Sequence, residues 1–408
     1  MSSTTPLSKR AQQMPASPIR RLAPFAVAAR KAGKTVYPLN IGQPDIPTPQ
    51  AILDRLRSYS DINVPYGPSQ GLPEFIEALR WYYAGIGVPL AAEEIFVTTA
   101  GSEALLFTLG ALCDPGEQVI VFEPFYTNYN GFAAMIGVEL VPVTTHAENG
   151  YHLPPRAEIE AKIGPCTRAL LICSPNNPTG TVYRDAEIDL LAAICRERGL
   201  VLIADEVYRE FVYDGHKHRS VLTLAGMEQQ VVVVDSVSKR YSLCGARIGN
   251  IVSRNRDFMA AIMRFGQARL CPPTVEQVAC TALTEVPASY IAGVIAEYQK
   301  RRDLVYDALT AIPGVLVRKP EGAFYICARL PVDDASVFAE WLLKDFALDG
   351  ETVMVAPADG FYATPGLGRD EVRIAYVLEV PKLERAMKCL GAALAAYPGR
   401  VSAGAVRG

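Results

Sequence analysis

The sequence has little of what marks proteins that bind metals, nucleotides or membranes. Its 408 residues include only four histidines, and its nine cysteines contain no Cys-x-x-Cys pair, which argues against a structural zinc site. Neither GxxxxGKS/T nor GxGxxG occurs, so the chain lacks a Walker loop and a dinucleotide-binding fingerprint. No uninterrupted apolar run approaches the length of a transmembrane helix, and no internal repeat or low-complexity segment is visible. The balance of hydrophobic and charged residues is that of an ordinary globular protein.

The net charge and the N-terminal residues further limit the partners and the cellular compartment that the protein is expected to have. The net charge of -3, with both signs intermixed, argues against a nucleic-acid-binding surface. Residues 1–14 read as a polar tail without an apolar signal core. Several cysteines lie inside apolar runs, as Cys173 does in residues 169–173, which is typical of reduced thiols in a protein core. We therefore expect a cytoplasmic protein without a bound metal.

The order of predicted elements indicates an α/β fold. The chain is long enough for more than one hydrophobic core. Apolar runs of strand length alternate with helical patterns as far as residue 251, which is typical of a largely parallel sheet with helical crossovers. Beyond this point the pattern changes to long helices and shorter strands. We predict a large domain over residues 46–286, in which helices flank the mostly parallel sheet. Residues 15–45 and 287–408 are predicted to form a smaller α+β domain.

Residues with chemical functions follow the ends of five predicted strands. The carboxyl ends of parallel strands meet at one edge of a sheet, where α/β proteins place their ligand sites. Side chains that follow these ends are therefore expected to gather in one site, which independent surface features would not do. In chain order, the five ends are followed by the turn Gly101-Ser102, the aromatic Tyr126, the amide Asn177, the pair Asp205 and Tyr208, and Lys239.

The last of these strands carries the residue of greatest interest. Four consecutive valines, residues 231–234, predict a strand that is buried on both faces. The strand leads directly to Lys239, whose amine can form an imine if neighbouring cations and partial desolvation keep its pKa low. Arg247, eight residues later, offers a guanidinium fork suited to a phosphate. Taken alone, the stretch also fits a solvated Lys–Arg pair after a core strand, but the gathering of five strand ends favours a functional site.

Three other segments allow two interpretations each. The small-residue turn over residues 99–103 either cradles a phosphate with free backbone N–H groups or simply caps a helix with Ser102. Gly42, in a proline-rich loop, either admits a close ligand or belongs to a plain turn. The adjacent acids Asp205 and Glu206 fit a metal site, a salt bridge or a base, and we expect Asp205 to be buried with a partner.

Three motifs together resemble the fold-type I, class I/II pyridoxal-phosphate-dependent aminotransferases. They are Asn176-Asn177-Pro178-Thr179-Gly180, Ala204-Asp205-Glu206-Val207-Tyr208, and Ser236-Val237-Ser238-Lys239 with Arg247. Each motif is weak alone, but their order and spacing are specific. The resemblance covers nearly the whole chain, from residues 41–45 to residues 372–374. It implies the fold of that family and pyridoxal 5'-phosphate as the cofactor.

The resemblance also implies a role for each residue around the cofactor ring. Lys239 would bond to the cofactor aldehyde and, once released, would move the proton between the substrate Cα and the cofactor. Asp205 would pair with the protonated ring nitrogen and keep the ring an electron sink. Tyr208 and Asn177 would hydrogen-bond the ring oxygen, and Tyr126 would stack on the ring.

By the same resemblance, the anionic groups of cofactor and substrate have their own partners. The phosphate would be held by Gly101, Ser102, Glu103, Ser236, Ser238 and Arg247, and by Tyr66 from the other subunit of a homodimer. Arg373 would clamp the substrate α-carboxylate, helped by Gly42 and Asn177. Without the resemblance, Arg373 would read as an ordinary exposed strand arginine.

Two departures from the family pattern concern the cofactor loop and the substrate. Val237 and Ala246 stand where Phe and Trp are usual, which leaves the chemistry intact. Some aspartate-specific relatives carry a lysine in the phosphate turn, where this chain has Glu103. Others use an arginine of the partner subunit before a Pro-Pro pair, which makes Arg269, ahead of residues 270–273, the candidate for binding a side-chain carboxylate.

The resemblance therefore favours an aminotransferase that passes the amino group of aspartate to 2-oxoglutarate by a ping-pong cycle. An aromatic amino acid, alanine or a specialised metabolite as substrate, and elimination or oxidation as outcome, use the same fold and cofactor. A ligand-sensing regulator is the alternative from another class. It is disfavoured because fewer than fifty residues precede the Gly42 loop, and no basic helix-turn-helix fits among them.

Overall fold

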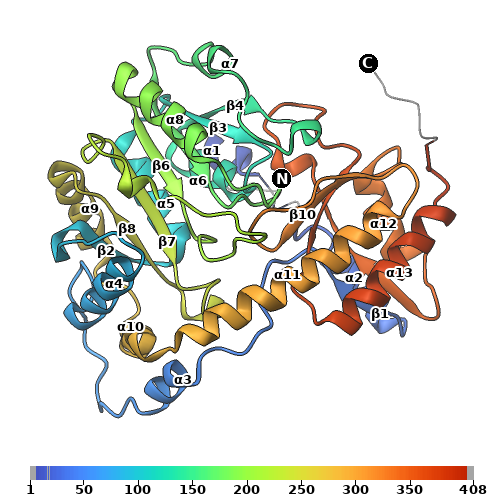
Figure 1. Ribbon diagram of the computed structural model, residues 1–408, viewed down its shortest axis with the longest axis horizontal. Helices are drawn as coiled ribbons and strands as arrows, with labels where there is room; N and C mark the ends of the chain where they lie inside the picture. Colours follow the sequence, from blue (N-terminus) through green and yellow to red (C-terminus); the bar gives the residue numbers. More distant parts are fainter. Residues whose placement is uncertain (1–5, 16, 18, 402–408) are drawn as a thin grey trace.

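The computed structural model describes residues 6–15, 17 and 19–401, and its centre is a seven-stranded sheet (Figure 1). The strand order is β2-β8-β7-β6-β5-β3-β4. Only β8 runs antiparallel to its neighbours, so the other six strands point the same way and confirm the predicted α/β fold. The strands are β2 (Ile95–Thr99), β3 (Gln118–Glu123), β4 (Glu139–Thr144), β5 (Thr167–Cys173), β6 (Val201–Asp205), β7 (Val231–Ser236) and β8 (Ile248–Val252).

Helices cover both faces of this sheet. Val231 and Val233 of β7 belong to one hydrophobic cluster and Val232 and Val234 to another, as the alternation of a doubly buried strand requires. The first cluster receives α3 (Gln50–Arg57), α4 (Pro73–Gly85), α8 (Asp185–Arg198) and α10 (Thr274–Cys280). The second receives α5 (Ala100–Leu112), α6 (Asn128–Ile136) and α9 (Arg256–Arg269).

The C-terminal elements form a second core around smaller sheets. One sheet has the order β12 (Ala356–Pro357), β13 (Glu371–Ala375), β10 (Tyr325–Arg329) and β9 (Leu316–Val317). In a separate pair, β1 (Thr35–Pro38) runs parallel to β11 (Glu351–Met354). Figure 1 shows the long α11 (Ala288–Thr310) running from α10 towards these elements. The remaining helices of this part are α2 (Ala23–Lys31), α12 (Ala335–Lys344) and α13 (Val380–Ala396).

The pairing of β1 with β11 supports the assignment of residues 15–45 to the smaller domain, while the domain boundaries stay a prediction. The N-terminal residues differ from the sequence analysis. Residues 9–13 form a short helix, α1 (Lys9–Gln13), where a polar tail was expected, because Ser8 Oγ accepts a hydrogen bond from the backbone N–H of Ala11. The short helix α7 (Arg156–Glu160) completes the fold.

In the part of the chain that the structure describes, no single helix is long and apolar enough to cross a membrane. The segments Thr274–Glu285 and Ala288–Thr310 meet the length and composition only as a pair, and a bend of 94° separates them.

Gly249 permits the close contact between β8 and the start of α5, and its replacement tests this packing. A Cβ at Gly249 would lie 2.5 Å from the carbonyl carbon of Ala100 and 2.7 Å from the backbone nitrogen of Gly101. We expect Gly249→Ala to lower the free energy of unfolding by about 1–3 kcal/mol, because backbone atoms must shift. The measurement is the midpoint of urea or thermal unfolding.

Gly293 provides the matched control. It lies inside α11, and a Cβ there meets nothing within 4 Å. Gly293→Ala is expected to raise stability by about 0.5–1 kcal/mol through helix propensity alone. Equal effects of the two substitutions would contradict the packing argument.

Candidate active site

A cavity of about 630 Å³ opens at the carboxyl ends of the parallel strands. It is closed on the opposite side by residues 40–43 and by side chains from β10 and β13. Twelve of the fifteen predicted site residues line it: Gly42, Gly101, Ser102, Tyr126, Asn177, Asp205, Tyr208, Ser236, Ser238, Lys239, Arg247 and Arg373. Strand ends far apart in the sequence therefore meet at one place, as expected of this topology.

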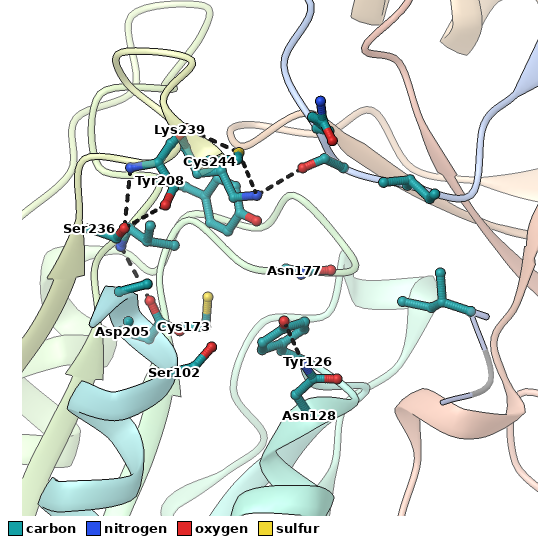
Figure 2. A pocket seen from close by; sticks show the side chains of 18 of the residues that line it. Ser102, Tyr126, Asn128, Cys173, Asn177, Asp205, Tyr208, Ser236, Lys239 and Cys244 are labelled. Atoms are coloured by element: carbon teal, nitrogen blue, oxygen red, sulfur yellow. Dashed lines mark hydrogen bonds between the residues drawn. The ribbon is translucent and has the colours of Figure 1, made fainter. Parts of the chain in front are cut away.

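Lys239 extends from the end of β7 across the cavity (Figure 2). Its Nζ donates a hydrogen bond of 2.8 Å to the carbonyl of Gly42 and lies 3.8 Å from Cys244 Sγ. Burial lowers the pKa of Lys239, and the cations Arg373 and Arg247 lower it further, against an opposing effect of Cys244. A lowered pKa favours the neutral amine, which is the nucleophilic and basic form.

Asp205 is a buried carboxylate at the end of β6, and no lysine or arginine of the described residues forms an ion pair with it. Tyr129 donates a hydrogen bond of 2.8 Å to one oxygen, and the backbone N–H of Val207 donates one of 3.3 Å to the other. Burial raises the pKa of Asp205 to about 6, which these hydrogen bonds only partly offset. A ring nitrogen that carries a proton would supply the cation that this carboxylate lacks.

Asp235, at the end of the neighbouring β7, has the opposite environment. Arg240 Nη2 lies 2.5 and 2.7 Å from its two oxygens, and Arg240 Nε lies 3.1 Å from Glu210. Burial opposes ionisation, but Arg209 and Arg240 hold the pKa of Asp235 below its usual value. This ion pair, which the sequence analysis missed, fixes the loop that carries Lys239. The only signal for it was an acid at the strand end followed five residues later by an arginine.

The start of α5 and the loop after β7 form an anion cradle. The helix begins at Ala100, so Ser102 lies inside its first turn and the alternative of Ser102 as a cap is wrong. Ser236 Oγ and Ser238 Oγ lie 2.7 Å apart beside this turn. Arg247 adopts a left-handed backbone (φ 57°), which is uncommon for a residue with a side chain. Free N–H groups, hydroxyls and a guanidinium around one end of the cavity suit a phosphate dianion.

Arg373 forms the other end of the cavity. It is 2% exposed, donates a hydrogen bond of 3.0 Å to Asn177 Oδ1 and another to the carbonyl of Asn40. Its guanidinium lies over the ring of Tyr325, 4.5 Å from the ring centroid. Among the described residues, its buried Nε has no hydrogen-bond partner. A buried guanidinium with a free N–H requires an acceptor, and a carboxylate is the usual one.

Tyr325 is a further cavity residue that the sequence analysis did not single out. Its hydroxyl lies 2.8 Å from the hydroxyl of Tyr208, so the two phenols form one unit. A Cβ at Gly42 would lie 1.8 Å from the Tyr325 hydroxyl, which explains the glycine at that position. Only its place in a predicted strand was visible in the sequence, because the contact joins residues from distant parts of the chain.

Three predicted residues do not line the cavity. The Glu103 carboxylate accepts a hydrogen bond of 2.8 Å from the backbone N–H of Thr99 and lies 3.7 Å from Arg269 Nη2. The Glu103 carboxylate therefore does not face the cavity, whereas a contact of its backbone N–H, in the first turn of α5, with a phosphate stays a prediction. Arg269 donates to the carbonyls of Ser69 and Val97 at 3.3 Å instead of facing the cavity of its own chain. Tyr66 is 80% exposed, and its role across a dimer stays a prediction.

Among the described residues, no group of three or more histidine, cysteine or acidic side chains is placed to hold a metal ion. The arrangement instead suits a planar group with one phosphate and one protonated ring nitrogen, next to a carboxylate-bearing substrate. It can bind these anions at two ends and present an amine between them.

Comparison with known proteins supports this interpretation. The family model described as aminotransferase class I and II matches residues 34–390. An aspartate aminotransferase of Geobacillus stearothermophilus is 29% identical over 94% of this chain and 97% of its own length. An arginine–pyruvate transaminase of Pseudomonas aeruginosa is 30% identical, over 89% and 91%. The solved structure of aspartate aminotransferase from Thermus thermophilus with maleate is 30% identical and superposes with a TM-score of 0.87, covering 96% and 100%.

The raised pKa of Asp205 predicts a pH effect on the protein without cofactor. A carboxyl pKa of about 6 in the folded state, against about 4 in the unfolded chain, makes stability fall as pH rises from about 4 to 6. Asp205→Asn removes this loss, so above pH 6 the variant should gain up to about 3 kcal/mol relative to the wild type. The measurement is urea unfolding of both cofactor-free proteins between pH 4.5 and 8.

Asp61→Asn, on an exposed segment, controls for the loss of one negative charge. It should leave the shape of the pH–stability curve unchanged. If the Asp205→Asn curve runs parallel to that of the wild type, burial does not raise the pKa of Asp205 in the folded protein.

Proposed function

The chain belongs to the class I and II aminotransferase family, and on this premise we propose that it binds pyridoxal phosphate in the cavity and transfers the amino group of aspartate to 2-oxoglutarate. Transamination is the activity of the family, which uses this cofactor. The identity of the donor and acceptor, and the roles of the individual residues, belong to the proposal.

The observation that carries the proposal is the match between the charges lining the cavity and those of the cofactor and substrate. Asp205 lacks a cation, which the protonated ring nitrogen provides. The cradle of Gly101, Ser102, Ser236, Ser238 and Arg247 lacks an anion, which the phosphate provides. Arg373 has a free buried N–H, which the substrate α-carboxylate satisfies. Bound pyridoxal phosphate supplies an aldehyde carbon and an electron-withdrawing ring.

In this proposal Arg373 binds the substrate and Lys239 transfers the proton. Arg373 fixes the substrate by its α-carboxylate, so that the Cα hydrogen faces the amine of Lys239. The lowered pKa of Lys239 leaves its amine free to take a proton from the substrate Cα and to return it in the second half-reaction. Tyr208 and Asn177 donate or accept hydrogen bonds at the ring, and Tyr126 covers one ring face and excludes water.

Three further parts of the proposal have separate support. Aspartate as donor is supported by relatives that are named aspartate aminotransferases. A homodimer is supported by the exposed apolar side chains next to Tyr66, namely Ile62 and Val64 at 99% and 60% exposure. A cytoplasmic location is supported by the nine cysteines, all of which are unpaired. The alternative donors, an aromatic amino acid, alanine or a specialised metabolite, use the same cavity.

The spectrum of the loaded enzyme tests the proposed function. We expect wild-type protein to show a visible absorbance band that survives dialysis and is bleached by aspartate within a single turnover. Lys239→Ala should lose the band and slow the donor half-reaction at least about 10²-fold, because it removes both the covalent link and the proton-transfer base. Glutamate, alanine and tyrosine are added in parallel to identify the donor.

Lys344→Ala, which removes an exposed lysine paired with Glu340, is the control and should behave as the wild type. Absence of a band after cofactor is supplied would refute the proposed mechanism. Bleaching by another amino acid alone would keep the mechanism and overturn aspartate as the donor.

A further inference from the structure

The cavity contains one cation more than the cofactor and the α-carboxylate require. Besides Lys239, whose lowered pKa favours the neutral amine, the residues that line it include three arginines, Arg20, Arg247 and Arg373. The two carboxylates that line the cavity do not neutralise these arginines. Asp235 pairs with Arg240 instead, and Asp205 would pair with the protonated ring nitrogen of the cofactor. With Arg247 assigned to the phosphate and Arg373 to the α-carboxylate, Arg20 is left for another anion.

The backbone ties Arg20 to the carboxylate-binding end of the cavity. Arg20 lies in a turn closed by hydrogen bonds from the N–H groups of Arg20 and Arg21 to the carbonyl of Ser17, at 3.1 and 3.2 Å. The preceding carbonyl, of Ile19, accepts a hydrogen bond of 3.2 Å from Asn40 Nδ2. The carbonyl of Asn40 in turn accepts from Arg373. One residue, Asn40, thus joins the segment of Arg20 to the guanidinium that would clamp the substrate.

The electrostatics of Tyr126 place Arg20 in the same space. Burial and the Asp205 carboxylate raise the pKa of the Tyr126 phenol, and the cations Arg373, Arg247 and Arg20 act in the opposite direction. The charge of Arg20 therefore acts on the ring that would cover the cofactor. The Arg20 side chain is exposed at the cavity mouth, so it has the freedom to meet groups of different length.

The neighbouring Arg21 does not share the position of Arg20 at the cavity. Its guanidinium lies 3.6 Å from Asp359 and donates to Ser336, and it does not line the cavity. Arg269, the candidate from the sequence, does not line the cavity of its own chain, and its Nη2 contacts Glu103 and two backbone carbonyls. Arg20 is thus the cavity arginine that remains open to a substrate side chain.

We propose that Arg20 binds the second carboxylate of a dicarboxylic substrate and thereby makes the enzyme selective for acidic amino acids and their oxo acids. The inference rests on the proposed function and names the residue that sets its substrate class. A guanidinium fork matches a carboxylate in two parallel hydrogen bonds. A flexible, exposed arginine accommodates both the shorter side chain of aspartate and the longer one of 2-oxoglutarate, as a ping-pong cycle through one site requires.

The test compares Arg20→Met with Arg21→Met, two adjacent substitutions that remove the same charge. We expect Arg20→Met to lower kcat/KM for aspartate and glutamate about 10- to 100-fold and to leave kcat/KM for alanine within about twofold. Arg21→Met should change none of the three. Arg20→Lys should retain part of the activity with aspartate, because it keeps the charge without the fork.

Equilibrium binding gives a second readout that does not depend on turnover. Succinate and butyrate, a dicarboxylate and a monocarboxylate with the same four-carbon chain, are titrated calorimetrically into the loaded wild type and both variants. Arg20→Met should lose the preference for succinate, and Arg21→Met should keep it.

Equal losses for aspartate and alanine in Arg20→Met would overturn the proposal, as would an unchanged preference for succinate. A selective loss of aspartate activity in Arg269→Met, with Arg20→Met unaffected, would return the role to Arg269. If no amino acid bleaches the wild-type band, the proposed function fails, while the succinate titration still decides the role of Arg20.

Discussion

The ion pair between Asp235 and Arg240 is the interaction on which the site depends. Asp235 is the second-last residue of β7, and Arg240 directly follows Lys239. The ion pair therefore joins the two ends of the segment that carries Ser236, Ser238 and Lys239. Both side chains are nearly inaccessible, at 1% and 2% exposure. Removal of one partner from such a pair costs about 3–5 kcal/mol, because the other charge stays buried. The loop is therefore held by electrostatics and by the strand before it, independently of any bound cofactor.

A second consequence of this pair is that two neighbouring buried carboxylates, Asp235 and Asp205, have different electrostatic environments. Asp235 is neutralised by arginine and keeps an ordinary ionised state, whereas Asp205, across the adjacent strand, is buried without a cation. If both acids had arginine partners, the cavity floor would have no remaining need for a positive ring. If neither had one, two buried negative charges would repel each other and destabilise the sheet edge. Arg240 thus lets Asp205 remain available.

The sequence predicted the scaffold of the site well because its signals are local. The valines of β7 alternate between two cores, and Asn177, Asp205 and Lys239, which lie at or shortly after strand ends, line the cavity. The direction of the Glu103 side chain could not be predicted, because its carboxylate turns back to the N–H of Thr99 and towards Arg269, which is distant in the sequence. Tyr325 was missed because it reaches the cavity through contacts with Tyr208, 117 residues away, and with Gly42, which is still more distant in the sequence. Arg20 was missed because no strand end or motif marks the turn in which it lies.

The residues that the sequence predicted and those that it did not also differ in function. The predicted ones bear on the chemistry of the enzyme, and the others on its choice of substrate. The strand ends carry the groups to which we assign the transamination chemistry, and relatives named for aspartate and for arginine share the family with this chain at similar identity. The residues of the sheet edge therefore do not by themselves decide the donor. That decision requires side chains that face the substrate's far end, and Arg20, which we propose for this role, lies outside the sheet in a turn joined to Asn40 through the carbonyl of Ile19. The exposed side chain at position 20 can change at small cost in stability, so it is a place where selectivity and fold are weakly coupled.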